Sequence, residues 1–345
     1  MTTITMLGAA NADELATLAE KPATKFVHVG HPGKTSANLI QISRTDSVAK
    51  QAVTNLAKLG YYLYKQDNDV SSFVRHDEIK HLWHRVKTGE FSANDQGVIY
   101  SYTPPTLESD SPTILVVFAS IHEDMYGSGL MRYFKHNFPS IQKYVTPGTG
   151  ILRIADIGGV TGAFYLNTVA HPTNTARVQK LIEQVASDND VDRDSIVFYG
   201  ASKGATGALY HGMDMNIRCV VVDPIVSDEV YERRYRDSHY TADGIFPERK
   251  NQVFDRLVEK VVSDKRFSGL NARWAVICSD RSPQYDYINR TLIQPMWGGA
   301  AFFNSQHPSI TDHPDVGPNT ITMMTTLLNN QLYRMPIRSG IYKFT

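Results

Sequence analysis

From residue 111 onward, short uninterrupted apolar runs alternate with segments of helical periodicity, and this alternation constrains the fold more than any other feature. A strand that is apolar at every position is buried on both faces, whereas a half-exposed strand alternates apolar and polar residues. Such runs separated by helices predict a mostly parallel sheet with helices on both faces, which is an α/β fold. The apolar runs are 114–119, 150–155, 195–199, 219–222 and 274–278, with a sixth at 301–303. The expected helices lie at 128–138, at 173–187, from 203 onward and at 317–332.

The beginning of the chain has a different pattern, which predicts a smaller α+β region. Its expected elements are helices at 45–60 and 75–87, with an aromatic strand at 60–64 between them. A turn-rich segment that contains three prolines follows at 102–112. We therefore expect an N-terminal α+β region at 1–110 and an α/β domain at 111–345.

The charge balance and the cysteines exclude several classes of protein. Lys and Arg number 35, as do Asp and Glu, so the formal net charge is zero, and we expect no nucleic-acid partner because phosphate contacts need an excess of basic residues. No run approaches the roughly 18 apolar residues of a transmembrane helix, and the first residues lack the basic flank of a secretory signal. These features predict a cytoplasmic protein. Cys219 and Cys278 lie inside apolar runs, which favours buried thiols over a disulfide or a zinc site.

The third apolar run ends in Gly200-Ala201-Ser202-Lys203-Gly204, which matches G-x-S-x-G, the nucleophile elbow of α/β-hydrolases. The sharp turn from strand to helix needs small residues two positions before and two positions after the serine, and glycines stand at both. A serine at this turn points away from the sheet and lies at a helix N-terminus, whose free N–H groups favour a developing negative charge. The motif predicts that Ser202 is a nucleophile; the alternative is a tight turn in which Ser202 only caps the helix.

A serine nucleophile needs a base, because its hydroxyl is protonated at neutral pH. In this fold the acid and then the histidine follow the serine along the chain. We favour His313 over His307, because His313 lies on the loop between the last apolar run and the last helix. We expect His211, within the elbow helix, to point away from the site, and His239 to lie in a charged excursion above the sheet.

Three aspartates are candidates for the acid that orients this histidine. Asp280 directly follows the fifth apolar run, the usual position for such an acid, and we favour it. Asp286, six residues later, can serve if the loop curls back. Asp223, which ends the fourth run, is a further candidate, since some members of the fold place the acid there. Each also has a structural interpretation, as a helix cap or a turn residue.

The oxyanion hole of this fold combines the backbone N–H of the residue after the nucleophile with one from the loop after the first strand of the domain. These rules assign the backbone amides of Lys203 and Ile121. The Lys203 side chain itself is expected to face solvent at the start of the helix.

No metal or cofactor site is predicted. His307, Asp312, His313 and Asp315 have no zinc-binding spacing, so we expect no metal ion there. The glycines of 158–162 follow a strand but lack the G-x-G-x-x-G spacing of a dinucleotide loop, which argues against a nucleotide cofactor.

The elbow region, from Phe198 to Gly212, resembles the serine elbow of the XcbB/CpsF family of bacterial capsular-polysaccharide biosynthesis proteins. Weaker resemblances to the family occur at 60–64, 153–156, 164–168, 222–225 and 282–286. The similarity covers roughly residues 50–335, and the elbow departs from the usual pattern at Gly204-Ala205, where two glycines are usual. The resemblance implies an α/β-hydrolase-like domain and suggests acyl transfer to or from a surface glycan.

Two functions of different classes follow from this sequence. The first is a serine hydrolase or acyltransferase that uses a Ser202–His313–Asp280 triad on a small acyl donor or an acylated glycan. The second is a catalytically silent α/β-hydrolase scaffold that serves as an assembly partner in polysaccharide biosynthesis or export. The acid and the histidine favour the enzyme. The sequence leaves open whether copies of the chain form a homo-oligomer.

Overall fold

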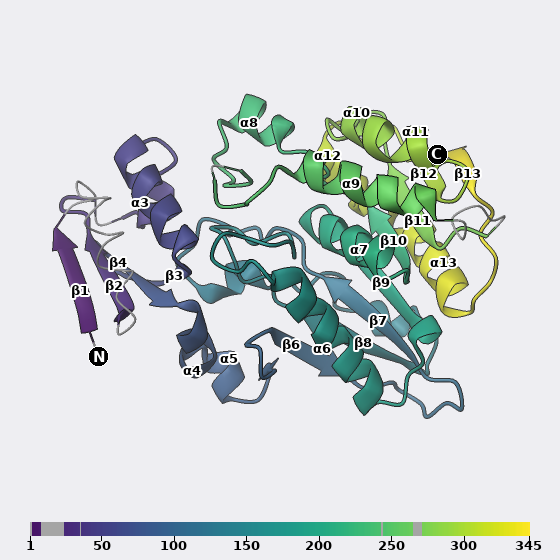
Figure 1. The fold of residues 1–345 in the computed structure, drawn as a ribbon, viewed down its shortest axis with the longest axis horizontal. Helices are drawn as coiled ribbons and strands as arrows, with labels where there is room; N and C mark the ends of the chain where they lie inside the picture. Colours follow the sequence, from purple (N-terminus) through teal and green to yellow (C-terminus); the bar gives the residue numbers. More distant parts are fainter. Residues whose placement is uncertain (1, 8–23, 35, 243, 265–270) are drawn as a thin grey trace.

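The structure is a computed structural model that describes residues 2–7, 24–34, 36–242, 244–264 and 271–345. These residues form two sheets, a larger one of nine strands and a smaller one of four (Figure 1). The strand order is β13-β12-β11-β10-β9-β7-β8-β6-β5 in the larger sheet and β1-β2-β4-β3 in the smaller one.

The larger sheet is parallel except at one edge, where β6 runs antiparallel to β8 and β5 runs antiparallel to β6. Its central strands are apolar and buried at nearly every position, as a parallel sheet with two covered faces requires. Its strands are β5 (Ser92–Ala93), β6 (Ile99–Thr103), β7 (Thr113–Phe118), β8 (Thr149–Ile154), β9 (Ile196–Ala201), β10 (Arg218–Val222), β11 (Trp274–Cys278), β12 (Ala301–Ser305) and β13 (Gly340–Phe344).

Helices cover both faces of this sheet. Leu181 of α6, Leu209 of α7 and Phe254 of α9 belong to the apolar cluster on one face. Met324 and Leu328 of α13 belong to the cluster on the other face. The longer helices of the domain are α6 (Asn174–Asp188), α7 (Lys203–Asp214), α8 (Glu229–Tyr235), α9 (Lys250–Ser263) and α13 (Ile321–Leu332), and the short ones are α10 (Tyr285–Ile288), α11 (Gln294–Met296) and α12 (His313–Val316). The predicted α/β-hydrolase-like fold class is confirmed.

The smaller sheet and its helices form the N-terminal α+β region, which lies at one end of the molecule (Figure 1). Leu39 and Leu56 of this region share an apolar cluster with Tyr240 and Ile245 of the segment between β10 and β11. The N-terminal region therefore packs against the main domain. Its elements are β1 (Thr2–Leu7), β2 (Thr24–Gly30), α2 (Leu39–Ile42), α3 (Ser47–Lys58), β3 (Tyr61–Asp67), β4 (Val70–Arg75), α4 (Ile79–Leu82) and α5 (His84–Lys87).

Two expectations from the sequence differ from the structure. The boundary expected near residue 110 does not coincide with the edge of the larger sheet, because β5 and β6 lie before it and β6 pairs with β8. The helix expected at 128–138 is only a 3-10 turn, η2 (Leu130–Tyr133). Gly129 directly precedes this turn and Pro139 directly follows the expected helix, and both residue types disfavour a helix. The remaining short turns are η1 (His76–Glu78), η3 (Ile141–Lys143), η4 (Arg193–Ser195), η7 (Pro318–Thr320) and the π turn η6 (Asn289–Ile293).

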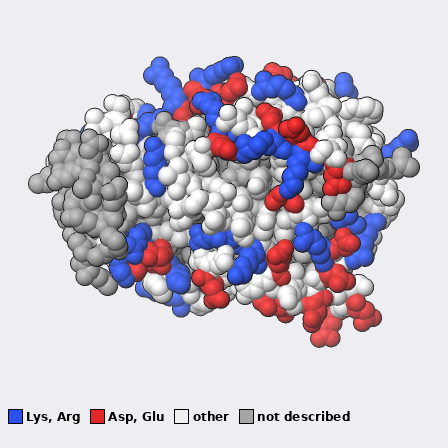
Figure 2. All heavy atoms as spheres, in the orientation of Figure 1, with Lys and Arg blue, Asp and Glu red and all other residues white. Residues whose placement is uncertain are grey.

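Figure 2 shows charged side chains of both signs over most of the drawn face, with a small group of acidic ones at its lower edge. This mixture is in keeping with the formal net charge of zero. Among the described residues, no helix is both long enough and apolar enough to pass through a membrane.

Candidate active site

The candidate nucleophile Ser202 lies at a strained turn between β9 and α7. Its backbone has φ 55° and ψ −122°, in the left-handed half of conformational space that residues with a side chain rarely adopt. Neighbouring β10 contributes to the turn, since the Ser202 backbone N–H donates to the Val222 carbonyl at 2.9 Å. The strained conformation agrees with the predicted nucleophile elbow.

The two glycines of the motif are required by close backbone contacts. A Cβ atom on Gly200 would lie 2.1 Å from the carbonyl oxygen of Gly204 in the first turn of α7. A Cβ atom on Gly204 would lie 2.2 Å from the carbonyl oxygen of Phe118 at the end of β7. The helix can therefore begin directly against the sheet only when both positions lack a side chain.

The structure places His313 beside Ser202. His313 is the first residue of α12, and its Nε2 lies 2.7 Å from the Ser202 Oγ. The Asp312 side chain caps this short helix by accepting the His313 backbone N–H at 2.8 Å. Arg234 of α8 in turn donates to both carboxylate oxygens of Asp312, at 3.0 and 2.8 Å. His307, the alternative base, has its Nδ1 near the Ser309 backbone N–H instead.

The acid beside His313 is Asp223, and the expectation that Asp280 reaches this histidine is wrong. The Asp223 Oδ2 lies 2.6 Å from the His313 Nδ1. Asp280 is exposed, and its carboxylate accepts hydrogen bonds from Asn304 and Gln306 at 3.3 and 3.0 Å. Asp286 is also exposed, on α10.

The order of the strands explains this outcome. Ser202 directly follows β9, and Asp223 directly follows β10, which is paired with β9. Asp280 follows β11, one strand farther from the nucleophile. The His313 ring, which follows β12 in the chain, contacts the residues that directly follow β9 and β10. Which aspartate contacts His313 depends on which strands are neighbours in the sheet, and the order of the apolar runs along the chain does not show this.

Asp223 is almost completely buried, with 1% of its surface exposed, and its Oδ2 also accepts the Ser282 hydroxyl proton at 2.5 Å. Because an ionised carboxylate can only accept, it holds the proton of His313 on Nδ1 and leaves Nε2 free to accept from Ser202. Sequence reasoning missed Ser282. Only its place after β11, beside the end of β10, could have indicated it.

The two backbone amides predicted for the oxyanion hole lie on elements next to Ser202. Lys203 is the first residue of α7, so its N–H is one of the first-turn N–H groups that have no carbonyl partner within the helix. Ile121 lies on the loop after β7. Ser120 holds this loop, since its hydroxyl donates to the Ala201 carbonyl at 2.7 Å and its N–H donates to Asn137 at 2.8 Å.

The expectation that the Lys203 side chain faces solvent is wrong, because this side chain is fully buried. Its Nζ lies 2.7 Å from the carboxylate of Asp156, which is equally buried. The error has a clear cause: the first turn of α7 is covered by the loop after β8, and nothing in the local sequence shows that packing.

Ser202 and His313 open into a pocket of about 490 Å³, within the usual range for small-molecule sites. Most of its exposed surface is apolar, and the one lysine among the described residues that line it, Lys135, pairs with Glu123 at 2.5 Å. The apolar side chains of the wall include Ile121, Met125, Phe138, Tyr231, Ile321 and Met324.

His239, expected in a charged excursion, is one of the residues that line the pocket. Burial lowers its pKa to about 4, and the nearby Arg44 and His313 act in the same direction. Its ring lies against those of Tyr231 and Tyr235, with centroids 4.7 Å apart in both cases. His239 is therefore neutral near pH 7 and contributes an aromatic surface rather than a charge. Over the described part of the chain, no group of three or more His, Cys, Asp or Glu side chains is placed to hold a metal ion.

The sequence matches no family model, and no curated protein matches it. Several solved structures align with a large part of this chain. The glycosylation-associated protein (Gap123) complex from Streptococcus agalactiae aligns at 13% identity and a TM-score of 0.49 over 80% of this chain, which spans about half (53%) of that chain. FphF, a fluorophosphonate-binding serine hydrolase of Staphylococcus aureus, aligns at 14% identity and a TM-score of 0.48, covering 70% of this chain and 96% of that one.

An S-formylglutathione hydrolase from Agrobacterium tumefaciens aligns at 13% identity and a TM-score of 0.47, over 71% of this chain and 94% of its own. At such identities a likeness concerns the fold alone and does not transfer an activity. The fold assignment itself follows from the strand order and the covered sheet described above.

Proposed function

We propose that this protein is a serine-dependent esterase or acyltransferase that works through an acyl-enzyme, with Ser202 as nucleophile, His313 as base and Asp223 as the orienting acid. One observation carries the proposal. Three side chains from separate loops form a continuous hydrogen-bonded series, Ser202 Oγ to His313 Nε2 at 2.7 Å and His313 Nδ1 to Asp223 Oδ2 at 2.6 Å. This series faces an apolar pocket and has the geometry that activates a serine.

In the first half of the reaction, the Ser202 Oγ attacks the carbonyl carbon of an ester while its proton passes to the His313 Nε2. The carbonyl oxygen becomes an oxyanion, which the backbone N–H groups of Lys203 and Ile121 would stabilise. The tetrahedral intermediate then expels the alcohol, which takes the proton from His313. The acyl group remains on Ser202 as an ester.

In the second half, the acceptor is water or a sugar hydroxyl. Its oxygen attacks the acyl carbon while its proton passes to His313, and Ser202 leaves and recovers that proton. Asp223 stabilises the imidazolium in both halves. Whether hydrolysis or transfer prevails depends on how completely the acceptor excludes water from the pocket.

The side chains that line the pocket favour the binding of an uncharged acyl group. Its wall is mainly apolar, His239 contributes a neutral ring, and Lys135 is paired with Glu123. A carboxylate or phosphate on the acyl chain would lose its hydration here without gaining a free cation. We therefore propose a short, apolar acyl ester as the donor.

For the alcohol side, we propose a surface or capsular glycan, on the strength of the resemblance of the elbow to the XcbB/CpsF family. A cytoplasmic location and a place in capsule biosynthesis belong to the same proposal. Release of acetate from an acetylated polysaccharide, compared with release from a simple phenyl ester, tests the glycan directly.

Labelling with a fluorophosphonate tests the enzyme proposal. The probe phosphonylates only an activated serine, so we expect wild-type protein to be labelled and Ser202→Ala to remain unlabelled. Ser279→Ala is a suitable control, because Ser279 is buried and its hydroxyl donates to the Ser305 carbonyl. Equal labelling of wild type and Ser202→Ala, or no labelling of either, would contradict the proposal and favour a catalytically silent scaffold.

A further inference from the structure

We infer that Lys203, Asp156 and Tyr165 form a buried polar framework that positions both backbone amides of the proposed oxyanion hole. The three are positioning residues, and this inference rests on the proposed function. It concerns the side chain of Lys203, whereas the reaction uses only the backbone N–H of that residue.

The first part of the framework anchors the start of α7. The Lys203 Nζ donates to the Asp156 Oδ2 at 2.7 Å, and the two side chains are 0% and 1% exposed. Asp156 follows the end of β8 and is held in turn, since its backbone N–H donates to the Tyr133 carbonyl at 2.9 Å. The Lys203 side chain is thus attached to the segment after one strand, while its backbone N–H lies in the first turn of α7, directly after Ser202.

The second part is a turn that wraps around Asp156. The backbone N–H groups of Phe164 and Tyr165 donate to the two Asp156 oxygens, each at 2.9 Å. Both residues have positive φ angles, 55° and 60°, so consecutive N–H groups converge on the carboxylate as in an anion-binding nest. A Cβ atom on Gly162 would lie 2.4 Å from Asp156 Oδ2 and 2.6 Å from Lys203 Nζ, so the turn closes directly over the ion pair.

The third part of the framework is the Tyr165 hydroxyl, which holds the segment that leads to the Ile121 amide. The Tyr165 hydroxyl accepts the backbone N–H of Ala119 at 2.6 Å and donates to the Ile154 carbonyl at 2.8 Å. Ala119 lies two residues before Ile121, at the end of β7. The path from Lys203 through Asp156 and Tyr165 therefore joins the elbow helix to the loop that carries the second amide.

The energetics of the pair favour a positioning role. Burying two charges costs several kcal/mol per ion before their attraction is counted, and apolar residues of similar size are often at least as stabilising. A cation at the N-terminus of a helix also opposes the helix dipole. A stretched or tilted amide, in contrast, weakens transition-state stabilisation steeply, because a donor must lie about 2.7–3.1 Å from the oxyanion.

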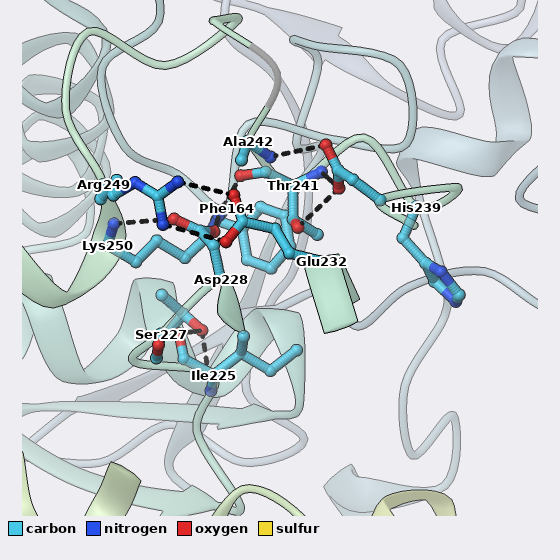
Figure 3. A network of polar contacts seen from close by, with 12 residues as sticks. Phe164, Ile225, Ser227, Asp228, Glu232, His239, Thr241, Ala242, Arg249 and Lys250 are labelled. Atoms are coloured by element: carbon cyan, nitrogen blue, oxygen red, sulfur yellow. Dashed lines mark hydrogen bonds and ion pairs between the residues drawn. The ribbon is translucent and has the colours of Figure 1, made fainter. Parts of the chain in front are cut away.

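The chain contains a matched control for this pair. Lys250 and Asp228 form a second ion pair, 2.5 Å apart, and both side chains are 1% exposed. Figure 3 shows this pair beside the Phe164 ring, with His239 directed away from it. The Lys250 Nζ lies 4.0 Å from the centroid of that ring and donates to the Thr241 carbonyl. Lys250 has the same charge, burial and partner type as Lys203 but lies on α9; it touches the framework only through the Phe164 ring and makes no hydrogen bond to Asp156, Lys203 or Tyr165.

The experiment compares Lys203→Met, Tyr165→Phe and Lys250→Met with wild type on p-nitrophenyl butyrate, together with the affinity for a trifluoromethyl ketone that mimics the tetrahedral intermediate. For Lys203→Met we expect kcat to fall about 10²–10³-fold, the cost of one misplaced oxyanion donor, with little change in KM. The affinity for the ketone should fall in parallel with kcat/KM, because both depend on the oxyanion. Lys250→Met should lose thermal stability to a similar extent yet keep kcat within about threefold, since it affects no transition-state contact.

Tyr165→Phe keeps the ring and removes only the hydroxyl, so this variant tests the inference if Lys203→Met does not fold. It should lower kcat about tenfold or more through the loosened Ala119 segment, again with KM preserved. Unchanged kcat in a folded Lys203→Met or Tyr165→Phe protein overturns the inference alone. An equal loss of kcat in Lys250→Met also overturns it, because burial of charge would then suffice as the cause. Wild-type protein without Ser202-dependent turnover overturns the proposed function and this inference together.

Discussion

Replacement of Asp223 by asparagine is the sharpest test of the proposed triad. In wild type the carboxylate accepts the His313 Nδ1–H at 2.6 Å, so the Nε2 of that ring is free to take the Ser202 proton. An asparagine keeps the shape but can present its NH2 group to Nδ1, which favours the tautomer with the proton on Nε2. That tautomer cannot act as a base toward Ser202.

The magnitude follows from the role of the carboxylate. Loss of the correct tautomer and of imidazolium stabilisation lowers kcat by about 10⁴ in this arrangement. Since each tenfold decrease in rate corresponds to about 1.36 kcal/mol of activation free energy, Asp223→Asn should raise the activation free energy by roughly 5.5 kcal/mol. Ser282→Ala removes one hydrogen bond of 2.5 Å to the same oxygen. It should lower kcat about tenfold, because one charge-assisted hydrogen bond contributes roughly 1.5 kcal/mol.

The assay is kcat and KM for p-nitrophenyl butyrate at pH 7 to 8, with circular dichroism to show that each variant is folded. Asp280→Asn is the matched control, because Asp280 is exposed and contacts Asn304 and Gln306 rather than His313. It should retain kcat. A folded Asp223→Asn protein with near wild-type kcat, or a severe loss in Asp280→Asn, would refute the reasoning.

Two further predictions concern stability. Gly204→Ala should lower the free energy of unfolding by about 3 kcal/mol, because its Cβ would lie 2.2 Å from the Phe118 carbonyl oxygen and the backbone must move. Urea unfolding measures this change, and Gly298→Ala is the control because a Cβ there meets no heavy atom within 4 Å. Equal stability of the two variants would contradict the prediction. Acidification should also destabilise the protein, because burial lowers the pKa of His211 from 6.5 to about 4. As the pH falls from 6.5 toward 4, the unfolded chain binds a proton at this residue that the folded chain does not bind. The stability present above pH 6.5 is therefore lost in that window. Between pH 7 and pH 5 this single group should cost about 2 kcal/mol in the free energy of unfolding, and a His211→Gln variant whose unfolding depends on pH as steeply as wild type would show that another group is responsible.

The sequence by itself determined those features that depend on neighbours along the chain. Uninterrupted apolar runs require burial on both faces, and this predicts the parallel sheet, whose strands the structure places within a few residues of the expected runs. The small residues around Ser202 predict a strained turn, and a φ of 55° is found there. The position of His313 after the last apolar run likewise predicts a histidine brought over the strand ends, and its Nε2 lies 2.7 Å from the Ser202 Oγ.

Only the tertiary structure decided which groups meet across the sheet. Asp223 rather than Asp280 contacts His313 because β10, not β11, is paired with β9, and strand order is set by long-range packing. The same holds for β5 and β6, which precede the expected domain boundary but join the larger sheet through β8. The Lys203 side chain is the clearest case. A lysine at the start of a helix normally remains solvated, and only the turn that follows β8 supplies the carboxylate and the cover that allow it to be buried.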